Sequence, residues 1–245
     1  MSDETDRAIV AVVLAAGQGT RMGASQNKVL MRLRGMPILV HTLAAFEATP
    51  LVTETLLVAH PGEVAQCQGL VAEFGLAKVV GVIAGGATRH QSEDQALAWL
   101  RRRIEAGEID LVLIHDGARP LVTPDEIAAV ISESRATGGA LLAAAVAPDE
   151  TLLLTTSDGQ ALQTWPSDAL ALAQTPQAFD ARKVLAAYDA ARADGFEGSD
   201  TAASFARAGG QVRVVFGPPS NLKVTTPDDL HRAEAWLESQ SKPSR

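Results

Sequence analysis

The chain has 245 residues, a formal net charge of −8 and a single cysteine, Cys67. A chain of this length buries a core without disulfides or structural metals, and a hydrophobic fraction of 47% excludes an intrinsically disordered protein. An acidic chain with 4% aromatic residues is poorly suited to nucleic acid, because tracking phosphates requires clustered Lys and Arg together with stacking rings. We therefore expect no nucleic-acid partner.

Neither a membrane span nor a secretion signal is expected. No apolar run approaches the ~20 residues that cross a bilayer. Residues 1–7 are polar and mostly acidic, unlike the basic start and apolar run of a signal peptide. One cysteine cannot form a disulfide within the chain, which fits a reducing compartment. The sequence thus predicts a cytoplasmic protein with no membrane partner.

Short apolar runs alternate with amphipathic segments along the whole chain. The predicted strands are Ile9–Ala15, Thr55–Ala59, Lys78–Ile83, Leu111–His115, Ala140–Val146 and Val212–Phe216. The predicted helices between and after them are Pro37–Ala48, Gly62–Phe74, Thr88–Ile104, Pro124–Ala136, Ala181–Ala193 and Pro227–Glu238. Because the strands are apolar throughout, both faces of their sheet should be covered. We expect residues 1–245 to form a single α/β domain of the Rossmann-like, doubly wound type with a mostly parallel, mixed sheet.

Residues 148–172 interrupt this alternation. Thr151–Thr155 and Ala161–Thr164 are short strand-like runs, and Ser157-Asp158-Gly159 between them is a turn signal. The segment lies between units of an otherwise regular fold. We therefore predict a β-hairpin arm that projects from the domain.

The strongest chemical signal is a glycine-rich segment after the first strand, with the order Ala15, Ala16, Gly17, Gly19, Arg21, Gly23 and Lys28. A Walker loop needs Gly-Lys-Ser/Thr at a helix start, and none follows here. A dinucleotide fingerprint needs its third glycine one position earlier than Gly23, so this segment does not match that motif either. A long glycine loop with two cations suits a nucleoside triphosphate that loses its outer two phosphates. Arg21 and Lys28 can then meet the charge that develops on the α-phosphate and on pyrophosphate. The alternative is a glycine-rich turn with two solvated cations.

A pair of glycines follows the third predicted strand and should lie on the same edge of the sheet. Gly85 and Gly86 can admit a flat base against the backbone, and Ser92 can hydrogen-bond a pyrimidine edge. The alternative is a helix start, with Thr88 as N-cap and glycines for the turn.

Polar residues at two other strand ends complete the candidate site. Asp116 is a candidate Mg²⁺ ligand, because Mg²⁺ prefers one or two carboxylates plus phosphate oxygens. The alternative is an Asp paired with Arg119 or capping a turn. For His115 a structural role is favoured over catalysis. Lys223, after the last strand, can hold a substrate phosphate, and the alternative is a surface lysine.

The motifs resemble, in order, those of the 2-C-methyl-D-erythritol 4-phosphate cytidylyltransferase family of isoprenoid precursor biosynthesis. The matching blocks are Ala15–Met22 with Lys28, Gly85–Ser92, His115–Pro120, Gln174–Phe179 and Asn221–Thr225. This resemblance implies transfer of a cytidylyl group from CTP to the acceptor 2-C-methyl-D-erythritol 4-phosphate, with Mg²⁺. It also implies a homodimer in which the arms interlock and complete the acceptor site of the partner.

The resemblance assigns roles residue by residue. Arg21, Lys28 and Lys223 are implied as catalytic. The implied nucleotide contacts are Ala15, Ala16, Gly17, Gly19, Gly85, Gly86, Ser92 and Gly117. The implied acceptor contacts are Asp116, Thr151, Ser167, Thr175 and Lys223, and Asp116 is also the implied metal ligand.

One departure from the family bears on the substrate. Ser167 stands where the family carries an arginine that grips the sugar phosphate, and no arginine lies between Arg135 and Arg182. This departure leaves open a protein that binds CTP without turnover. Transfer to ribitol 5-phosphate or another polyol phosphate also stays open, because the related polyol enzyme shares all five blocks.

Overall fold

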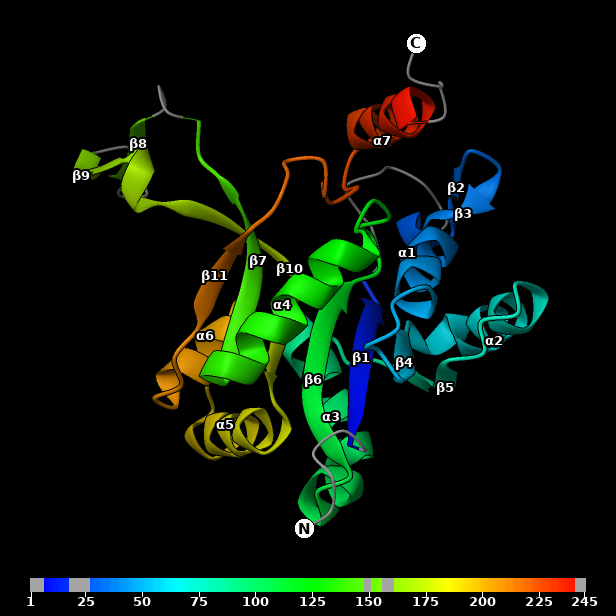
Figure 1. Ribbon diagram of the computed structural model, residues 1–245, viewed down its shortest axis with the longest axis horizontal. Helices are drawn as coiled ribbons and strands as arrows, with labels where there is room; N and C mark the ends of the chain where they lie inside the picture. The colour runs from blue at the N-terminus through cyan, green and yellow to red at the C-terminus, as the bar shows by residue number, and fades with distance from the viewer. Residues whose placement is uncertain (1–6, 18–26, 148–150, 156–160, 241–245) are drawn as a thin grey trace.

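The computed structural model describes residues 7–17, 27–147, 151–155 and 161–240, and its centre is a seven-stranded sheet (Figure 1). The strands of this sheet are β1 (Ala8–Ala15), β4 (Glu54–Ala59), β5 (Val79–Ala84), β6 (Ile109–Asp116), β7 (Gly139–Ala145), β10 (Ala171–Asp180) and β11 (Arg213–Phe216). Their order is β11-β7-β10-β6-β1-β4-β5. Only β10 runs antiparallel to its neighbours β6 and β7, so the sheet is mixed and mostly parallel, as the sequence predicts.

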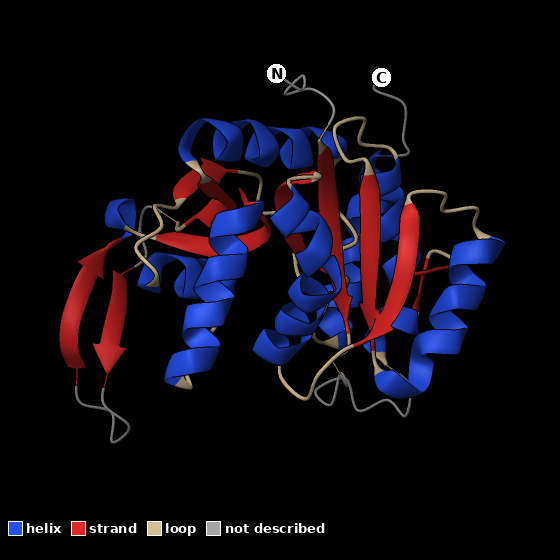
Figure 2. Cartoon of the chain, turned by 90° about the horizontal axis from the view of Figure 1, so that it is seen from below, coloured by secondary structure: helices blue, strands red, loops and turns tan. Residues whose placement is uncertain are grey.

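Helices cover both faces of the sheet, as Figure 2 shows. They are α1 (Ile38–Glu47), α2 (Val64–Glu73), α3 (Arg89–Ala106), α4 (Pro124–Thr137), α5 (Ala181–Asp194), α6 (Thr201–Arg207) and α7 (Pro227–Gln240). Ile9, Ala11 and Val13 of β1 share one core cluster with α1, α2 and α4. Val10 and Val12 point to the opposite face and pack with α3, α5 and α6. Strand alternation thus supplies two cores, which is why β1 reads as apolar throughout.

The six predicted strands and the six predicted helices are all present, but two elements of the main fold were not predicted. Strand β10 contains Gln174, Thr175 and Pro176, and proline within a run argues against a strand. The ladder with β7 shifts register between Ala173 and Gln177, so these polar residues leave the regular pairing. Helix α6 has seven residues and shows too little periodicity to be recognised.

The predicted arm is present as an antiparallel pair of strands, β8 (Thr151–Thr155) and β9 (Ala161–Pro166). It stands away from the main sheet at the upper left of Figure 1. Its predicted turn, Ser157-Asp158-Gly159, lies outside the described residues. The predicted boundary at residue 172 is wrong, because Ala171 and Leu172 pair with β7 and belong to the main sheet.

A third, smaller apolar cluster lies at the carboxyl end of the sheet. Its buried members from the chain around the start of α1 are Leu33 and Ile38. They pack with Leu121, with Val224 and with Ala233, which lies in α7. A short 3₁₀ turn, Lys28–Leu30, and the small hairpin of β2 (Arg32–Leu33) and β3 (Met36–Pro37) precede α1. Helix α7 therefore ties the chain around Lys28 to the chain around Lys223. Within the described part of the chain, no helix is long and apolar enough to cross a membrane.

Candidate active site

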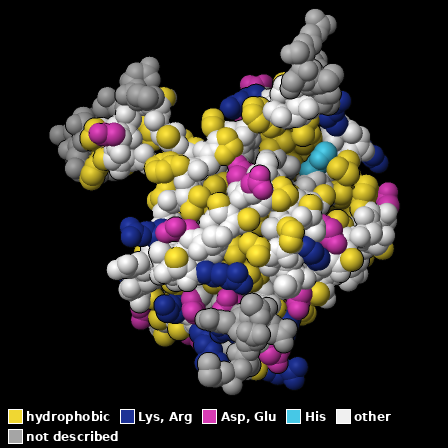
Figure 3. All heavy atoms as spheres, viewed as in Figure 1, with side chains coloured by type: hydrophobic (Ala, Val, Ile, Leu, Met, Phe, Trp, Pro, Cys, Tyr) yellow, Lys and Arg dark blue, Asp and Glu magenta, His cyan; other side chains and the backbone are white. Residues whose placement is uncertain are grey.

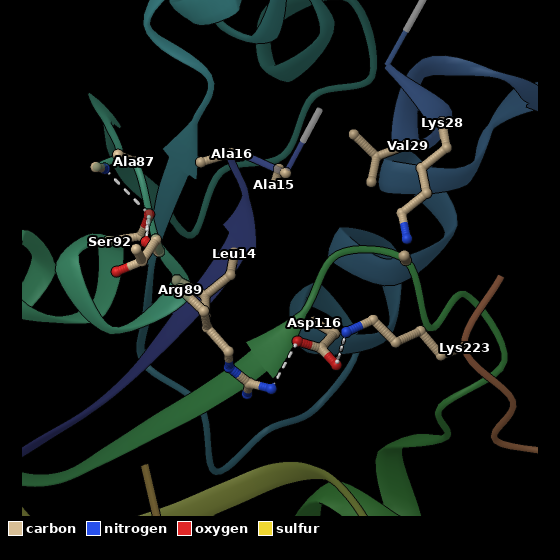
Figure 4. Close-up of a pocket in the computed structure, with 14 residues that line it drawn as sticks. Leu14, Ala15, Ala16, Lys28, Val29, Ala87, Arg89, Ser92, Asp116 and Lys223 are labelled. Atoms are coloured by element: carbon tan, nitrogen blue, oxygen red, sulfur yellow. Dashed lines mark hydrogen bonds and ion pairs between the residues drawn. The ribbon is translucent and has the colours of Figure 1, made fainter. Parts of the chain in front are cut away.

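A pocket lies at the carboxyl ends of β1, β5 and β6, where ligands bind in open α/β sheets (Figure 4). Most of the predicted site residues line it together, namely Ala15, Ala16, Gly17, Lys28, Gly86, Ser92, Asp116 and Lys223. They come from segments separated by up to about two hundred residues of sequence. Gly19 and Arg21, which the sequence also assigns to this site, lie outside the described residues.

Lys28 is placed by the residue that precedes it. Asn27 is buried, with 5% of the residue exposed, and its Nδ2 donates to the carbonyl oxygen of Ala15 (3.1 Å) and to Oε2 of Glu63 (2.7 Å). Its Oδ1 accepts from the backbone N–H of Val29 and caps the 3₁₀ turn. The returning end of the glycine-rich segment is thereby fixed to the end of β1. As a result, the amine of Lys28 points into the pocket (Figure 4).

The second loop, between β5 and α3, is closed around its glycines. A Cβ on Gly85 would come within 2.5 Å of the Cβ of Ala16, so this position has no room for a side chain. The Ser92 hydroxyl donates to the carbonyl oxygen of Thr88 (3.0 Å) and accepts from the N–H of Gly86 (3.1 Å). Thr88 also caps α3 by accepting from the N–H of Gln91, so the predicted helix start is confirmed. Ser92 shapes the loop, and its contact with a base stays a prediction.

Asp116 is the centre of a charged cluster. The Asp116 side chain is only 8% exposed. Its carboxylate forms ion pairs with Lys223 Nζ at 2.9 Å, with Arg89 Nη1 at 3.5 Å and with Arg119 Nε at 3.5 Å. Figure 4 shows Arg89 and Lys223 approaching it from opposite sides. The predicted alternative, an Asp paired with Arg119, is therefore confirmed. The arrangement leaves excess positive charge beside the pocket, which suits an anionic ligand.

Burial and the charged cluster together set the ionisation of Asp116 and of its neighbour His115. Burial alone would raise the pKa of Asp116, but the three cations outweigh burial and hold that pKa well below its usual range. His115 is fully buried, and burial lowers its pKa to about 3. Its ring packs edge-on against Phe46 at 5.0 Å, and Nε2 lies 3.4 Å from the carbonyl oxygen of Arg119. These contacts agree with the structural role that the sequence favours for His115.

Lys223 follows a segment that Asn221 anchors to β10. The fully buried Asn221 donates through Nδ2 to Oε1 of Gln174 (3.1 Å) and to the carbonyl oxygen of Thr175 (2.9 Å). Thr175 in turn accepts from the backbone N–H of Asp116 through its hydroxyl (3.0 Å). The irregular part of β10 therefore links the Asp116 strand end to the Lys223 segment.

Apart from Gly85, which packs against Ala16, the predicted residues that the structure describes outside this pocket fall into two groups. Gly117 and Thr175 support it from behind, and the N–H of Gly117 donates to the carbonyl oxygen of Leu14 at 2.8 Å. Thr151 and Ser167 belong to the arm, because Thr151 pairs with Pro166, the residue before Ser167. No residue of the described part of the arm lines the pocket of its own chain.

Two arginines of the matching blocks were not among the predicted functional residues. Arg89 and Arg119 both contact Asp116, and Arg119 Nη1 also donates to the carbonyl oxygen of Asn221 at 2.7 Å. The motif spacing shows that these arginines follow strand ends, but their convergence on one carboxylate needs the tertiary structure. Among the described residues, no group of three or more His, Cys, Asp or Glu side chains could hold a metal ion.

Comparison with known proteins gives one consistent result. A profile of the 2-C-methyl-D-erythritol 4-phosphate cytidylyltransferase family matches residues 9–239. The chain is 42% identical over 234 residues to the protein of that name from Geobacter metallireducens, covering 95% of this chain and 99% of the relative. It is 38% identical over 239 residues to the namesake from Acidobacterium capsulatum, covering 95% and 98%.

Solved structures agree with the sequence match. The 4-diphosphocytidyl-2C-methyl-D-erythritol synthase of Anaerococcus prevotii superposes with a TM-score of 0.81 at 26% identity, covering 97% of this chain and 100% of that one. The 2-C-methyl-D-erythritol 4-phosphate cytidylyltransferase of Thermus thermophilus gives a TM-score of 0.71 at 32% identity, covering 93% and 98%. With fold, pocket and sequence in agreement, the chain belongs to the 2-C-methyl-D-erythritol 4-phosphate cytidylyltransferase family.

Proposed function

We propose that this enzyme transfers the cytidylyl group of CTP to 2-C-methyl-D-erythritol 4-phosphate. The products are 4-diphosphocytidyl-2-C-methyl-D-erythritol and pyrophosphate. The observation that carries the proposal is the pocket itself, which combines a glycine-rich strand end, Lys28 and the cations around Asp116. Family membership supports the same reaction.

The chemistry is an in-line displacement at the α-phosphorus of CTP. An oxygen of the acceptor phosphate forms the new P–O bond while the bond to the β-phosphate breaks, and the electron pair leaves with pyrophosphate. A phosphomonoester carries a charge of about −1.5 to −2 near neutral pH, so the attacking group needs no general base. Catalysis then rests on positioning and charge stabilisation.

Each cation has a place in this scheme. Arg21 and Lys28 stabilise the charge that grows on the α-phosphate and on the leaving pyrophosphate. Lys223 holds the acceptor phosphate in line, and Asp116 orients Lys223 through their 2.9 Å contact. Gly85, Gly86 and Ser92 hold the nucleoside, and the absence of room for a Cβ at Gly85 supports a loop kept tight for a base.

In the proposed reaction, Mg²⁺ would reach the site bound to the triphosphate of CTP. Asp116 is already paired with three cations, so it suits at most one place among ligands that are mainly phosphate oxygens and water. When bound, Mg²⁺ would offset charge on the triphosphate. The residues of this chain would still supply the orientation of both substrates.

We further propose a homodimer formed through the arm, within the cytoplasm. Leu172, Val214 and Phe216 at the base of the arm are 46–66% exposed, and Trp165 within it is 41% exposed. Figure 3 shows apolar side chains gathered on the face below the arm. A second copy would cover these apolar side chains. The arm of each copy would then bring its Thr151 and Ser167 to the acceptor side of the other copy's pocket. Sedimentation of a fully active monomer at micromolar concentration would contradict this assembly.

The reaction is tested by measuring pyrophosphate release from CTP with a panel of phosphorylated polyols. The highest kcat/KM should be obtained with 2-C-methyl-D-erythritol 4-phosphate. Faster turnover of ribitol 5-phosphate would identify the related polyol enzyme instead. Tight CTP binding without pyrophosphate release in the presence of any acceptor would identify a binding protein that lacks turnover.

A further inference from the structure

A fully buried carboxylate lies directly behind the pocket and has no part in the scheme above. Glu93 of α3 has no exposed surface, although the other buried residues of α3 farther along the helix are the apolar Ala96, Leu97, Leu100 and Ile104. An ionised carboxylate is costly to bury unless several partners compensate it. Its presence therefore calls for a specific explanation.

The partners of Glu93 come from three helices. Oε1 accepts from Arg89 Nε at 2.9 Å and from the Thr201 hydroxyl of α6 at 3.0 Å. Oε2 accepts from the hydroxyl of Tyr188 on α5, whose ring stacks on His90 with centroids 4.6 Å apart. Burial and the nearby Glu93 charge raise the pKa of Tyr188, so this phenol stays protonated and donates. Glu93 is thus held from two sides and cannot change its rotamer freely.

The fixed carboxylate in turn determines where Arg89 points. A guanidinium is planar, so a hydrogen bond at Nε sets the direction of both terminal nitrogens. With Nε on Glu93, Nη1 lies 3.5 Å from Asp116 Oδ1, on the side of the carboxylate opposite Lys223. Arg89 would otherwise be free to turn toward the open pocket, which it also lines.

We propose that Glu93 is a positioning residue for cytidylyl transfer, acting through Arg89 on the orientation of Asp116. Tyr188 and Thr201 hold Glu93 in place, so α5 and α6 contribute to the acceptor side of the site without touching substrate. This inference rests on the proposed function for the role of Asp116. Glu93 acts on the acceptor side, because Arg89 links it to the carboxylate that pairs with Lys223.

Glu93→Gln tests the proposal with little change in shape. Misplacing a reacting group by about 1 Å can cost ~10²-fold in rate, and glutamine keeps part of the hydrogen bonding, so kcat should fall about tenfold. The KM for the acceptor should rise, whereas the KM for CTP should stay within about twofold. If kcat and the acceptor KM both stay within about twofold of the wild-type values, the proposal is overturned.

Asp189→Asn is the matched control for a merely structural effect. Asp189 pairs with Arg101, so it also joins α5 to α3, but this contact lies away from the pocket. The control should lower stability without changing kcat or either KM. Tyr188→Phe adds a coupling test, since it should lower kcat in the wild-type background and have no further effect in Glu93→Gln. Independent, additive losses would refute action through Glu93.

A readout that needs no turnover separates this inference from the proposed reaction. In ¹⁵N spectra, the Arg89 Nε–H should exchange with solvent at least about tenfold faster in Glu93→Gln than in the wild type. An unchanged exchange rate would show that Glu93 does not hold Arg89. If the wild type released no pyrophosphate with any acceptor, the proposed function would fail while this measurement still decided the positioning role.

Discussion

Replacing Asp116 by Asn should expose how much of the site depends on one carboxylate. The substitution keeps the shape but leaves Arg89, Arg119 and Lys223 without their shared anion, and only Glu93 still pairs with Arg89. Removing one partner of a buried ion pair costs about 3–5 kcal/mol. Because Lys223 and Arg89 are 36% and 29% exposed, solvent screens part of that loss, and we expect about 3 kcal/mol. At roughly 2–4 °C per kcal/mol for a chain of this size, Tm should fall by about 6–12 °C.

Urea denaturation and calorimetry without ligand measure this loss, and pyrophosphate release measures the catalytic effect. The variant should bind CTP at least as tightly as the wild type, because the triphosphate meets uncompensated cations, whereas kcat should fall at least ~10²-fold. Asp94→Asn is the control, since Asp94 pairs with Arg192 at the surface and should cost under about 1 kcal/mol. A stability loss for Asp116→Asn no larger than that of the control would refute the view of Asp116 as the neutralising centre.

Three further predictions concern separate parts of the site. Lys28→Ala should lower kcat by ~10²–10³-fold with little change in CTP affinity, and a near-normal kcat in steady-state assays would contradict its assigned role. Gly85→Ala should weaken CTP binding in calorimetric titrations, because its Cβ would lie 2.5 Å from that of Ala16; unchanged affinity would mean that the loop yields easily. His115 has a folded pKa of about 3, below its unfolded value of about 6.5, so its contribution to stability is complete above pH 6.5 and declines as pH falls toward 3. The free energy of unfolding should decrease by up to about 1.4 kcal/mol per pH unit from this group, and His115→Gln should reduce that slope in urea titrations.

Local patterns in the chain were sufficient to predict much of the fold. Six strands and six helices follow from apolar runs and helical periodicity, because each strand of a doubly covered sheet is apolar over its own length. At one helix start, Thr123 and Glu126 form a complete capping box, which residues only three positions apart can encode locally. Strand β10 was not predicted, because Gln174, Thr175 and Pro176 interrupt its apolar run. Its position between β6 and β7 depends on pairing with strands that are distant in the sequence.

The candidate site, like the fold, was only partly predictable from the sequence. By itself the sequence determined the order of the phosphate-binding motifs, and with them the candidate roles of Lys28, Asp116 and Lys223, because glycines and charges after strand ends meet at one edge of a parallel sheet. Only the tertiary structure decided that Arg89 and Lys223 approach Asp116 from opposite sides, and that a buried Glu93 sets the direction of Arg89. These contacts join residues from distant segments of the chain. Local sequence patterns do not show which charged side chains will be buried together, nor how that burial will change their pKa values.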